Sequence, residues 1–121
     1  MPSTSDSQLL KGVLSVLLLR LLAERESYGY QLVQRLRETG LIDIADGTVY
    51  PALSRLEREG RVSSRLVASR AGPARKYYRP TEAGYAALDQ GVANWLSLSA
   101  AVNPVLARPI PSQPAPPSEE T

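Results

Sequence analysis

The sequence contains no cysteine and no histidine among its 121 residues. The first absence rules out a disulfide framework and thiol catalysis. The two absences together remove nearly all transition-metal sites and the commonest general base of enzymes. Carboxylates and lysine could still support a reaction, but no catalytic constellation can be named from them. We therefore predict that the protein is not an enzyme and that it uses no metal and no cofactor.

A hydrophobic run long enough to cross a membrane is also missing. The most apolar stretch, which begins at Leu9, is interrupted by Lys11 and Arg20, so it falls short of the ~18 apolar residues that a span needs. It also lacks the basic leader and the small-residue cleavage site of a signal peptide. The sequence therefore predicts a cytoplasmic protein with no membrane partner.

Acidic residues are absent from one segment in the middle of the chain. Residues 61–79 contain six basic side chains and no acidic one, although the formal net charge of the whole chain is only +2. Basic charge gathered in one place favours a polyanionic partner. A solvated charged hairpin is the alternative explanation of this segment, and the charges alone do not exclude it.

The first third of the chain has the apolar periodicity of two helices. A helix over residues 7–24 is apolar on more than one face, so one face should pack on its own domain and another on a further helix or a second subunit. Ser27 is a plausible N-cap for a second helix over residues 28–39, with Gly40 just after its end.

The segment after residue 60 predicts a β-hairpin and a last helix. Two short runs, 62–69 and 75–79, flank a Gly-Pro turn, which is the pattern of a hairpin. Thr81 is a good N-cap for the last helix. Apolar or small residues then recur in alternating steps of three and four, as in a seam between two helices; they are Tyr85, Leu88, Val92, Trp95, Ser99, Val102 and Leu106.

A third helix, within residues 46–60, has two distinct faces. Val49, Leu53 and Leu56 fall on one stripe, which we predict to be the core face. If Thr48 is the N-cap, Pro51 lies in the first turn, where its missing N–H costs little. The other face then carries Ser54, Arg55 and Arg58 behind a helix start that suits a phosphate.

These arginines have two explanations. They could reach base edges or the backbone of DNA, since arginine to guanine is the commonest specific contact in the major groove. They could equally pair with glutamates three or four residues away on an ordinary amphipathic helix.

Three helices followed by a hairpin, with basic residues on the third helix and the hairpin, is the order of a winged helix-turn-helix. The predicted fold class is therefore mainly α with a small β-hairpin, a winged helix-turn-helix plus a C-terminal dimerisation helix. The predicted segments are a disordered start (1–6), the DNA-binding domain (7–80), the dimerisation helix (81–107) and a Pro-rich disordered tail (108–121).

Three stretches carry a resemblance to a known family. They are Tyr28-Gly29-Tyr30, the run GTVYPALSRLEREG from Gly47 to Gly60, and the run GPARKYYRPTEAG that begins at Gly72. Together they strongly resemble the PadR family of bacterial transcriptional regulators, over about residues 8–106. The single C-terminal helix is similar to that of the shorter subfamily.

The resemblance implies a homodimeric repressor that binds a pseudo-palindromic DNA operator. The first and last helices would form the dimer, and the two recognition helices would enter successive major grooves. By resemblance, Tyr28, Tyr50, Lys76 and Tyr77 lie at the DNA backbone; Lys11 is a further phosphate candidate. Of the neighbours Tyr77 and Tyr78, one should point into the core. The complete predicted DNA-binding set is Lys11, Tyr28, Thr48, Tyr50, Pro51, Ser54, Arg55, Arg58, Arg75, Lys76 and Tyr77.

The resemblance also raises the question of a small-molecule effector. In some members of the family a Trp at the place of Trp95 lines a cavity at the dimer centre and stacks on flat aromatic ligands. Val16 and Arg20 match other lining positions, and Ser99 is an unusual residue for a dry seam. These four residues are the predicted effector site, for a planar aromatic molecule that releases DNA. The alternative is that Trp95 is simply packed in the seam.

Two other functions compete with a ligand-responsive regulator. A winged-helix module could bind proteins, with the basic hairpin as a docking surface and the Pro-rich tail as a peptide ligand. A small-molecule carrier could use the central cavity alone, but that function would leave the basic surface unexplained.

Overall fold

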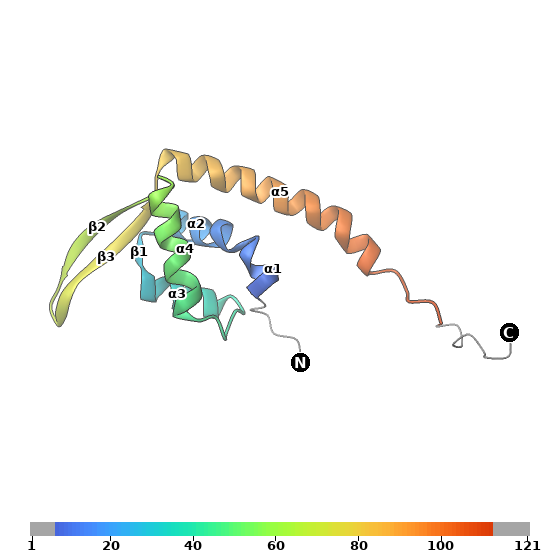
Figure 1. The fold of residues 1–121 in the computed structure, drawn as a ribbon, viewed down its shortest axis with the longest axis horizontal. Helices are drawn as coiled ribbons and strands as arrows, with labels where there is room; N and C mark the ends of the chain where they lie inside the picture. The colour runs from blue at the N-terminus through green and yellow to red at the C-terminus, as the bar shows by residue number, and fades with distance from the viewer. Residues whose placement is uncertain (1–6, 113–121) are drawn as a thin grey trace.

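The computed structural model of the protein describes residues 7–112 (Figure 1). The predicted disordered start and residues 113–121 of the predicted tail lie outside the described part. The elements in chain order are α1 (Ser7–Lys11), α2 (Leu14–Glu24), β1 (Ser27–Tyr28), α3 (Gly29–Glu38), α4 (Asp46–Arg58), β2 (Val62–Ser69), β3 (Gly72–Pro80) and α5 (Glu82–Leu106). Within residues 7–112 no helix is both long and apolar enough to span a membrane.

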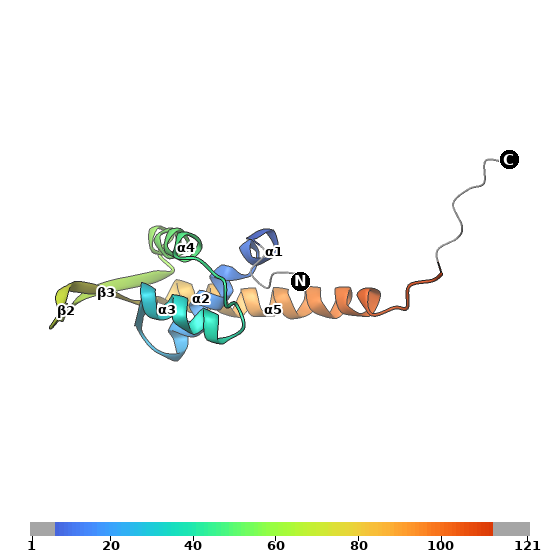
Figure 2. The same ribbon diagram turned by 90° about the horizontal axis from the view of Figure 1, so that it is seen from below.

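The predicted first helix is wrong in one respect, because two helices occupy its place. The α-helical pattern stops at Lys11 and resumes at Leu14, and Val13 N bonds to Leu10 O at 3.0 Å in a tighter turn. Gly12 stands at the break, where its low helix propensity favours an interruption. The chain thereby changes direction between α1 and α2 (Figure 2).

The core lies between α2, α3, α4 and the base of the sheet. Its largest fully buried side chains are leucines, isoleucine and valines from these helices and their connections: Leu18, Leu19, Leu22, Leu32, Val33, Leu36, Ile44, Val49, Leu53 and Leu56. Each such side chain contributes about 1.5–3 kcal/mol by leaving water. Val49, Leu53 and Leu56 therefore form the core face of α4, as their spacing predicts.

The helix predicted over residues 28–39 is α3. It begins one residue later than predicted, and Ser27 is not its cap. Ser27 belongs to β1, and its buried hydroxyl accepts a 3.0 Å bond from Arg35 Nη1. The cap interaction is made by Gln31, whose Oε1 accepts a bond from Tyr28 N at 3.2 Å. Gly40 follows α3 with φ +117°, which confirms its predicted place after the helix end.

The sheet has three antiparallel strands in the order β1-β3-β2. β1 is too short for periodicity to reveal, and it joins Ser27 to Tyr78 and Tyr28 to Tyr77 in the ladder. The hairpin is longer than predicted, because β3 begins at Gly72 and pairs Gly72 with Ser69. Its turn is therefore Arg70-Ala71, and the predicted Gly-Pro turn is part of the strand.

α5 and the hairpin project from opposite ends of the domain (Figure 1). Thr81 caps α5 as predicted, since its Oγ1 accepts a 3.1 Å bond from Gly84 N. The first turns of α5 pack on α2, where Leu88 is buried. The helix then continues past α1 (Figure 2), and its residues 93–106 are exposed except for the half-buried Ser99.

Candidate nucleic-acid interface

The helix predicted within residues 46–60 is α4, and it presents the predicted polar residues opposite its buried stripe. Pro51, Ser54, Arg55 and Arg58 are all exposed, while Ala52 and the stripe are buried. The helix ends at Arg58, and Gly60 follows two residues later with φ +74°, as its position in the sequence suggests. The outward face is thus free to meet a partner over three helical turns.

The predicted start of this helix is wrong. Its N-cap is Ala45, and Thr48 N and Val49 N bond to Ala45 O at 3.0 and 3.3 Å. Pro51 is therefore inside the helix and deprives the carbonyl of Gly47 of its intrahelical donor. Because both residues are exposed, solvent can hydrogen-bond that carbonyl.

The earlier start also places an acid at the helix N-terminus. Asp46 occupies the first turn, where a carboxylate interacts favourably with the helix dipole. It competes there with any phosphate. The positive charge for a polyanion must therefore come from side chains beside the helix rather than from its N-terminus alone.

The hairpin is joined to α4 by an ion pair. Lys76 Nζ on β3 lies 2.7 Å from Glu57 Oε1 on α4, and Ser64 on β2 donates a short hydrogen bond to the same carboxylate. The bond from Lys76 lowers the pKa of Glu57, and the same bond raises the pKa of Lys76. The two basic elements are thus connected side chain to side chain.

A second cluster holds the hairpin against β1. The guanidinium of Arg75 lies 4.6 Å from the centre of the Tyr28 ring and donates a 3.2 Å bond to its hydroxyl. Tyr77 meets Tyr28 edge to face with ring centres 5.2 Å apart. Tyr78 is the buried member of the pair, so Tyr77 is the one left on the accessible face.

Tyr50 lies against the first turn of α3. A Cβ added to Gly29 would be 2.4 Å from Cε1 of the Tyr50 ring, so the glycine leaves the space in which that ring rests. Partial burial raises the pKa of the Tyr50 hydroxyl, and the nearby Asp46 adds to the effect. The hydroxyl is therefore a neutral donor at neutral pH.

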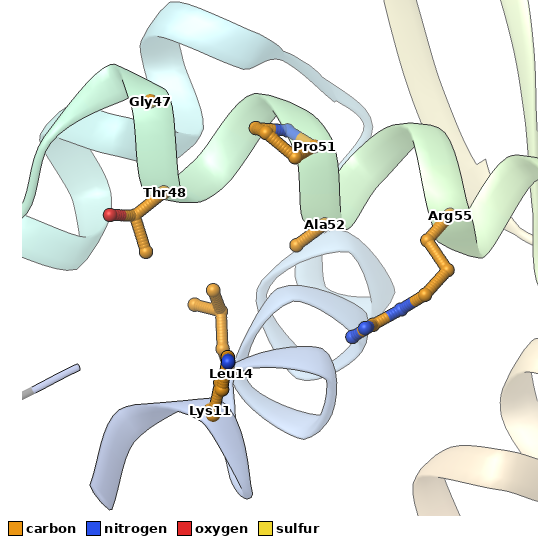
Figure 3. Close-up of a pocket in the computed structure, with 7 residues that line it drawn as sticks. All are labelled: Lys11, Leu14, Gly47, Thr48, Pro51, Ala52 and Arg55. Atoms are coloured by element: carbon orange, nitrogen blue, oxygen red, sulfur yellow. The ribbon is translucent and has the colours of Figure 1, made fainter. Parts of the chain in front are cut away.

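One groove brings together four of the predicted DNA-binding residues (Figure 3). It has a volume of about 300 Å³ and is lined by Lys11, Leu14, Gly47, Thr48, Pro51, Ala52 and Arg55, a set we call the α4 groove. Lys11 and Leu14 form one side and the residues of α4 form the other (Figure 3).

A separate cavity brings together three of the four predicted effector residues. It measures about 380 Å³ and is lined by Val13, Val16, Leu17, Arg20, Val92 and Trp95. Ser99 is further along α5 and is not among the lining residues described. The Arg20 guanidinium already has an acidic neighbour, since its Nη1 lies 3.0 Å from Glu24 Oε2.

Sequence reasoning missed several residues of this surface. Gly29 belongs to the Tyr-Gly-Tyr motif, but no pattern in the sequence indicates that the Tyr50 ring lies against it. Arg70 forms the exposed hairpin turn, and Arg65 forms a two-bond contact with Glu26 at 2.6 and 2.9 Å. The acid-free run of residues 61–79 was the signal for both arginines, but it could not show which of them is already paired.

The packed helices α2, α3 and α4, followed by a hairpin that pairs with the short strand β1, define a winged helix-turn-helix domain. The exposed basic residues of α4 fit a domain of this class that binds DNA. Comparison with known proteins agrees, because the profile of the transcriptional regulator PadR-like family matches residues 18–90. The chain belongs to the PadR-like family of DNA-binding transcriptional regulators. That family consists of regulators and not of enzymes.

Individual proteins are similar to this chain in sequence or structure. A PadR-like transcriptional regulator from Bacillus cereus has 37% identity and a TM-score of 0.76, over 85% of this chain and 100% of that chain. A PadR family regulator from Eggerthella lenta has 35% identity and a TM-score of 0.74, over 84% and 88%. A transcriptional regulator from Mycobacterium tuberculosis is 44% identical over 69 residues, 56% of this chain and 62% of that protein.

Proposed function

We propose that this protein is a homodimeric repressor that binds a pseudo-palindromic operator and is released by a planar aromatic effector. The observation that carries the DNA-binding part is the joining of α4 to the hairpin through Glu57 and Lys76. Two basic elements that are held together can contact a duplex as one unit, α4 in the major groove and the hairpin on the backbone beside it.

The test of DNA binding is fluorescence anisotropy on DNA from upstream of the protein's own gene, with random DNA of equal length as control. Binding at least a hundredfold tighter to the upstream DNA is expected. In a plot of the logarithm of the association constant against the logarithm of salt concentration, each phosphate contact should add about −0.9 to the slope. Arg58→Ala with Lys76→Ala should abolish the preference. No binding to any duplex at low salt would refute the proposal and favour a protein partner instead.

Repression is tested separately by transcription in vitro from a promoter that carries the bound DNA. We expect transcript to fall as protein is added and to be unaffected by the Arg58→Ala, Lys76→Ala variant. An increase in transcript would identify an activator.

The dimer is proposed from the second half of α5. Trp95, Val102 and Leu106 of the predicted seam are 50%, 37% and 76% exposed on a helix that extends beyond the other helices and the hairpin (Figure 1). Apolar surface of this extent marks an interaction site, and the heptad spacing fits a partner helix. A second copy would place two α4 helices about one DNA turn apart.

Sedimentation of Val102→Glu would test the dimer, because a charge in an apolar helix seam should separate the subunits. Leu66→Glu is the matched control, since Leu66 is an equally apolar residue, 73% exposed on the hairpin away from α5. The control should remain dimeric. A wild-type protein that sediments as a monomer at micromolar concentration would exclude the proposal.

The effector is proposed from the cavity beside Trp95. Its lining is mostly apolar and includes Trp95 and Arg20. Flat aromatic molecules stack favourably on an indole ring. Titration of Trp95 fluorescence with aromatic acids and cationic dyes should give saturable quenching that Val16→Phe removes by filling the cavity. A broad panel that quenches nothing would leave Trp95 with a packing role.

A further inference from the structure

The α4 groove contains an arginine whose direction differs from that of its neighbours on the helix. Successive residues of an α-helix are turned by about 100°. Val49, Ala52, Leu53 and Leu56 are buried, so Ser54 and Arg58 point most nearly away from the core and face outward. Arg55 follows Ala52 by three residues, which places it closer to the buried side, on the flank toward α2.

The contact that Arg55 makes agrees with this position. Its Nη2 donates a 3.4 Å bond to Ser15 Oγ on α2, so the guanidinium extends across the end of the groove (Figure 3). Lys11, from α1, lies across the same groove from Thr48 and Pro51 (Figure 3). The cationic side chains of Lys11 and Arg55 therefore both border the α4 groove.

The lining of the groove fits a particular chemical unit. None of the described residues that line it is acidic, and it has two cationic side chains and the Thr48 hydroxyl. Its floor is apolar, formed by the buried Leu14 and Ala52 with the exposed ring of Pro51 beside them. A nucleotide backbone has the complementary features, a singly charged phosphate attached to an apolar deoxyribose. Cations beside phosphate oxygens position a protein on DNA without reading sequence.

We propose that the α4 groove seats one sugar–phosphate unit of the operator, with Lys11 and Arg55 on the phosphate. Arg55 is then a positioning residue that sets the depth and register of α4, and base recognition falls to Ser54 and Arg58. This inference rests on the proposed DNA binding and assigns the two arginines of α4 to different tasks. It also explains why the groove is built from α1, α2 and α4 together, since the phosphate ties all three to the duplex.

The first experiment compares Arg55→Ala with Arg58→Ala on a duplex that the wild-type protein selects from a randomised library. Affinity is measured for that duplex, for each of its single-base-pair variants and for random DNA, at several salt concentrations. Arg55→Ala should weaken binding to all of them by the same factor, about tenfold per half-site for a charged hydrogen bond. Its salt slope should fall by about 0.9 per protomer. Arg58→Ala should instead lose discrimination at one base pair by tenfold or more.

The second experiment replaces individual phosphates of the selected duplex by neutral methylphosphonates. One position per half-site should weaken the wild-type protein. The same replacement should have a smaller effect on Arg55→Ala or on Lys11→Ala, where one cation remains, and no further effect on the double variant. Arg55→Gln, which keeps a donor for Ser15 but has no charge, should behave like Arg55→Ala. Ser15→Ala should leave the sensitivity to that phosphate unchanged. Thermal melting of each variant checks that the fold is intact.

Two results would overturn the assignment. If Arg55→Ala selected a different consensus with an unchanged salt slope, Arg55 would be a reader of bases. Alternatively, no phosphate position would couple to Arg55, which would leave the groove to a small anionic ligand or another partner. Failure of the proposed function itself is distinct, because the wild-type protein would then select no sequence at all.

Discussion

Replacing Gly29 by alanine should impair DNA binding without impairing the fold. The added Cβ would lie 2.4 Å from Cε1, 2.9 Å from Cζ and 3.1 Å from the hydroxyl oxygen of Tyr50. Ordinary carbon contacts begin near ~3.5 Å, so the ring must move by about 1 Å. The moving atoms are the far end of a side chain that is 42% exposed, so the backbone of α3 and α4 can stay in place.

The expected effect follows from the narrow distance range of hydrogen bonds. A hydroxyl displaced by about 1 Å loses a bond to a fixed phosphate oxygen, because such bonds span only about 2.5–3.0 Å. The loss should be about tenfold in affinity per half-site, as for other bonds to a charged acceptor. The unfolding free energy should change by less than about 1 kcal/mol, because alanine is a better helix former than glycine and offsets residual crowding.

The assay is anisotropy on the selected duplex, run as a double-mutant cycle with Tyr50→Ala. Gly29→Ala should cost affinity in the wild-type protein and nothing further in the Tyr50→Ala background. Urea unfolding monitors stability in all four proteins. Equal losses in both backgrounds, or unchanged affinity in the single variant, would refute the idea that Gly29 acts through Tyr50.

Three further predictions concern packing and charge. Gly84→Ala should destabilise the protein by at least about 3 kcal/mol in urea unfolding, because its Cβ would lie 1.9 Å from a backbone carbonyl oxygen of the turn before β2; normal stability would disprove that contact. Gly91→Ala should loosen the packing of α5 on α2, since its Cβ would meet Val16 Cγ2 at 2.5 Å, and Val16→Ala should restore the melting temperature. Glu57→Gln should remove the tie to Lys76. Because the pKa of Glu57 is lowered in the folded protein, the stability it adds is present above its unfolded pKa near 4.5 and is lost as pH falls through its folded pKa; a wild-type advantage that did not shrink as pH fell below 4.5 would contradict this.

The sequence was most informative where one physical requirement dominates. The stripe of Val49, Leu53 and Leu56 must be buried wherever the rest of the domain lies, so its face could be predicted from spacing alone. The cap at Thr81 and the glycines after α3 and α4 are local features, determined by their own hydrogen bonds and backbone angles. Their positions agreed with the structure for that reason.

The failures came from contacts made at a distance along the chain. Ser27 has the side chain of a cap, but its partner Tyr78 in β3 makes it a strand residue. Thr48 also has the side chain of a cap, but the helical hydrogen bonds already begin at Ala45 O, which accepts from Thr48 N and Val49 N. The direction of Arg55 depends on Ser15 of another helix, which no pattern within α4 could show.

The break between α1 and α2 brings neighbouring residues to two hollows. Lys11 and Leu14 line the α4 groove, while Val13, which lies between them in the chain, lines the cavity beside Trp95. A molecule beside Trp95 and a phosphate in the groove would therefore press on the same short stretch of backbone.

Thermodynamic linkage makes any such effect mutual. By whatever factor a molecule beside Trp95 changes the affinity for DNA, DNA must change the affinity for that molecule by the same factor. A fluorescence titration of Trp95 repeated with and without duplex would therefore measure communication between the two hollows directly, with no need to record transcription.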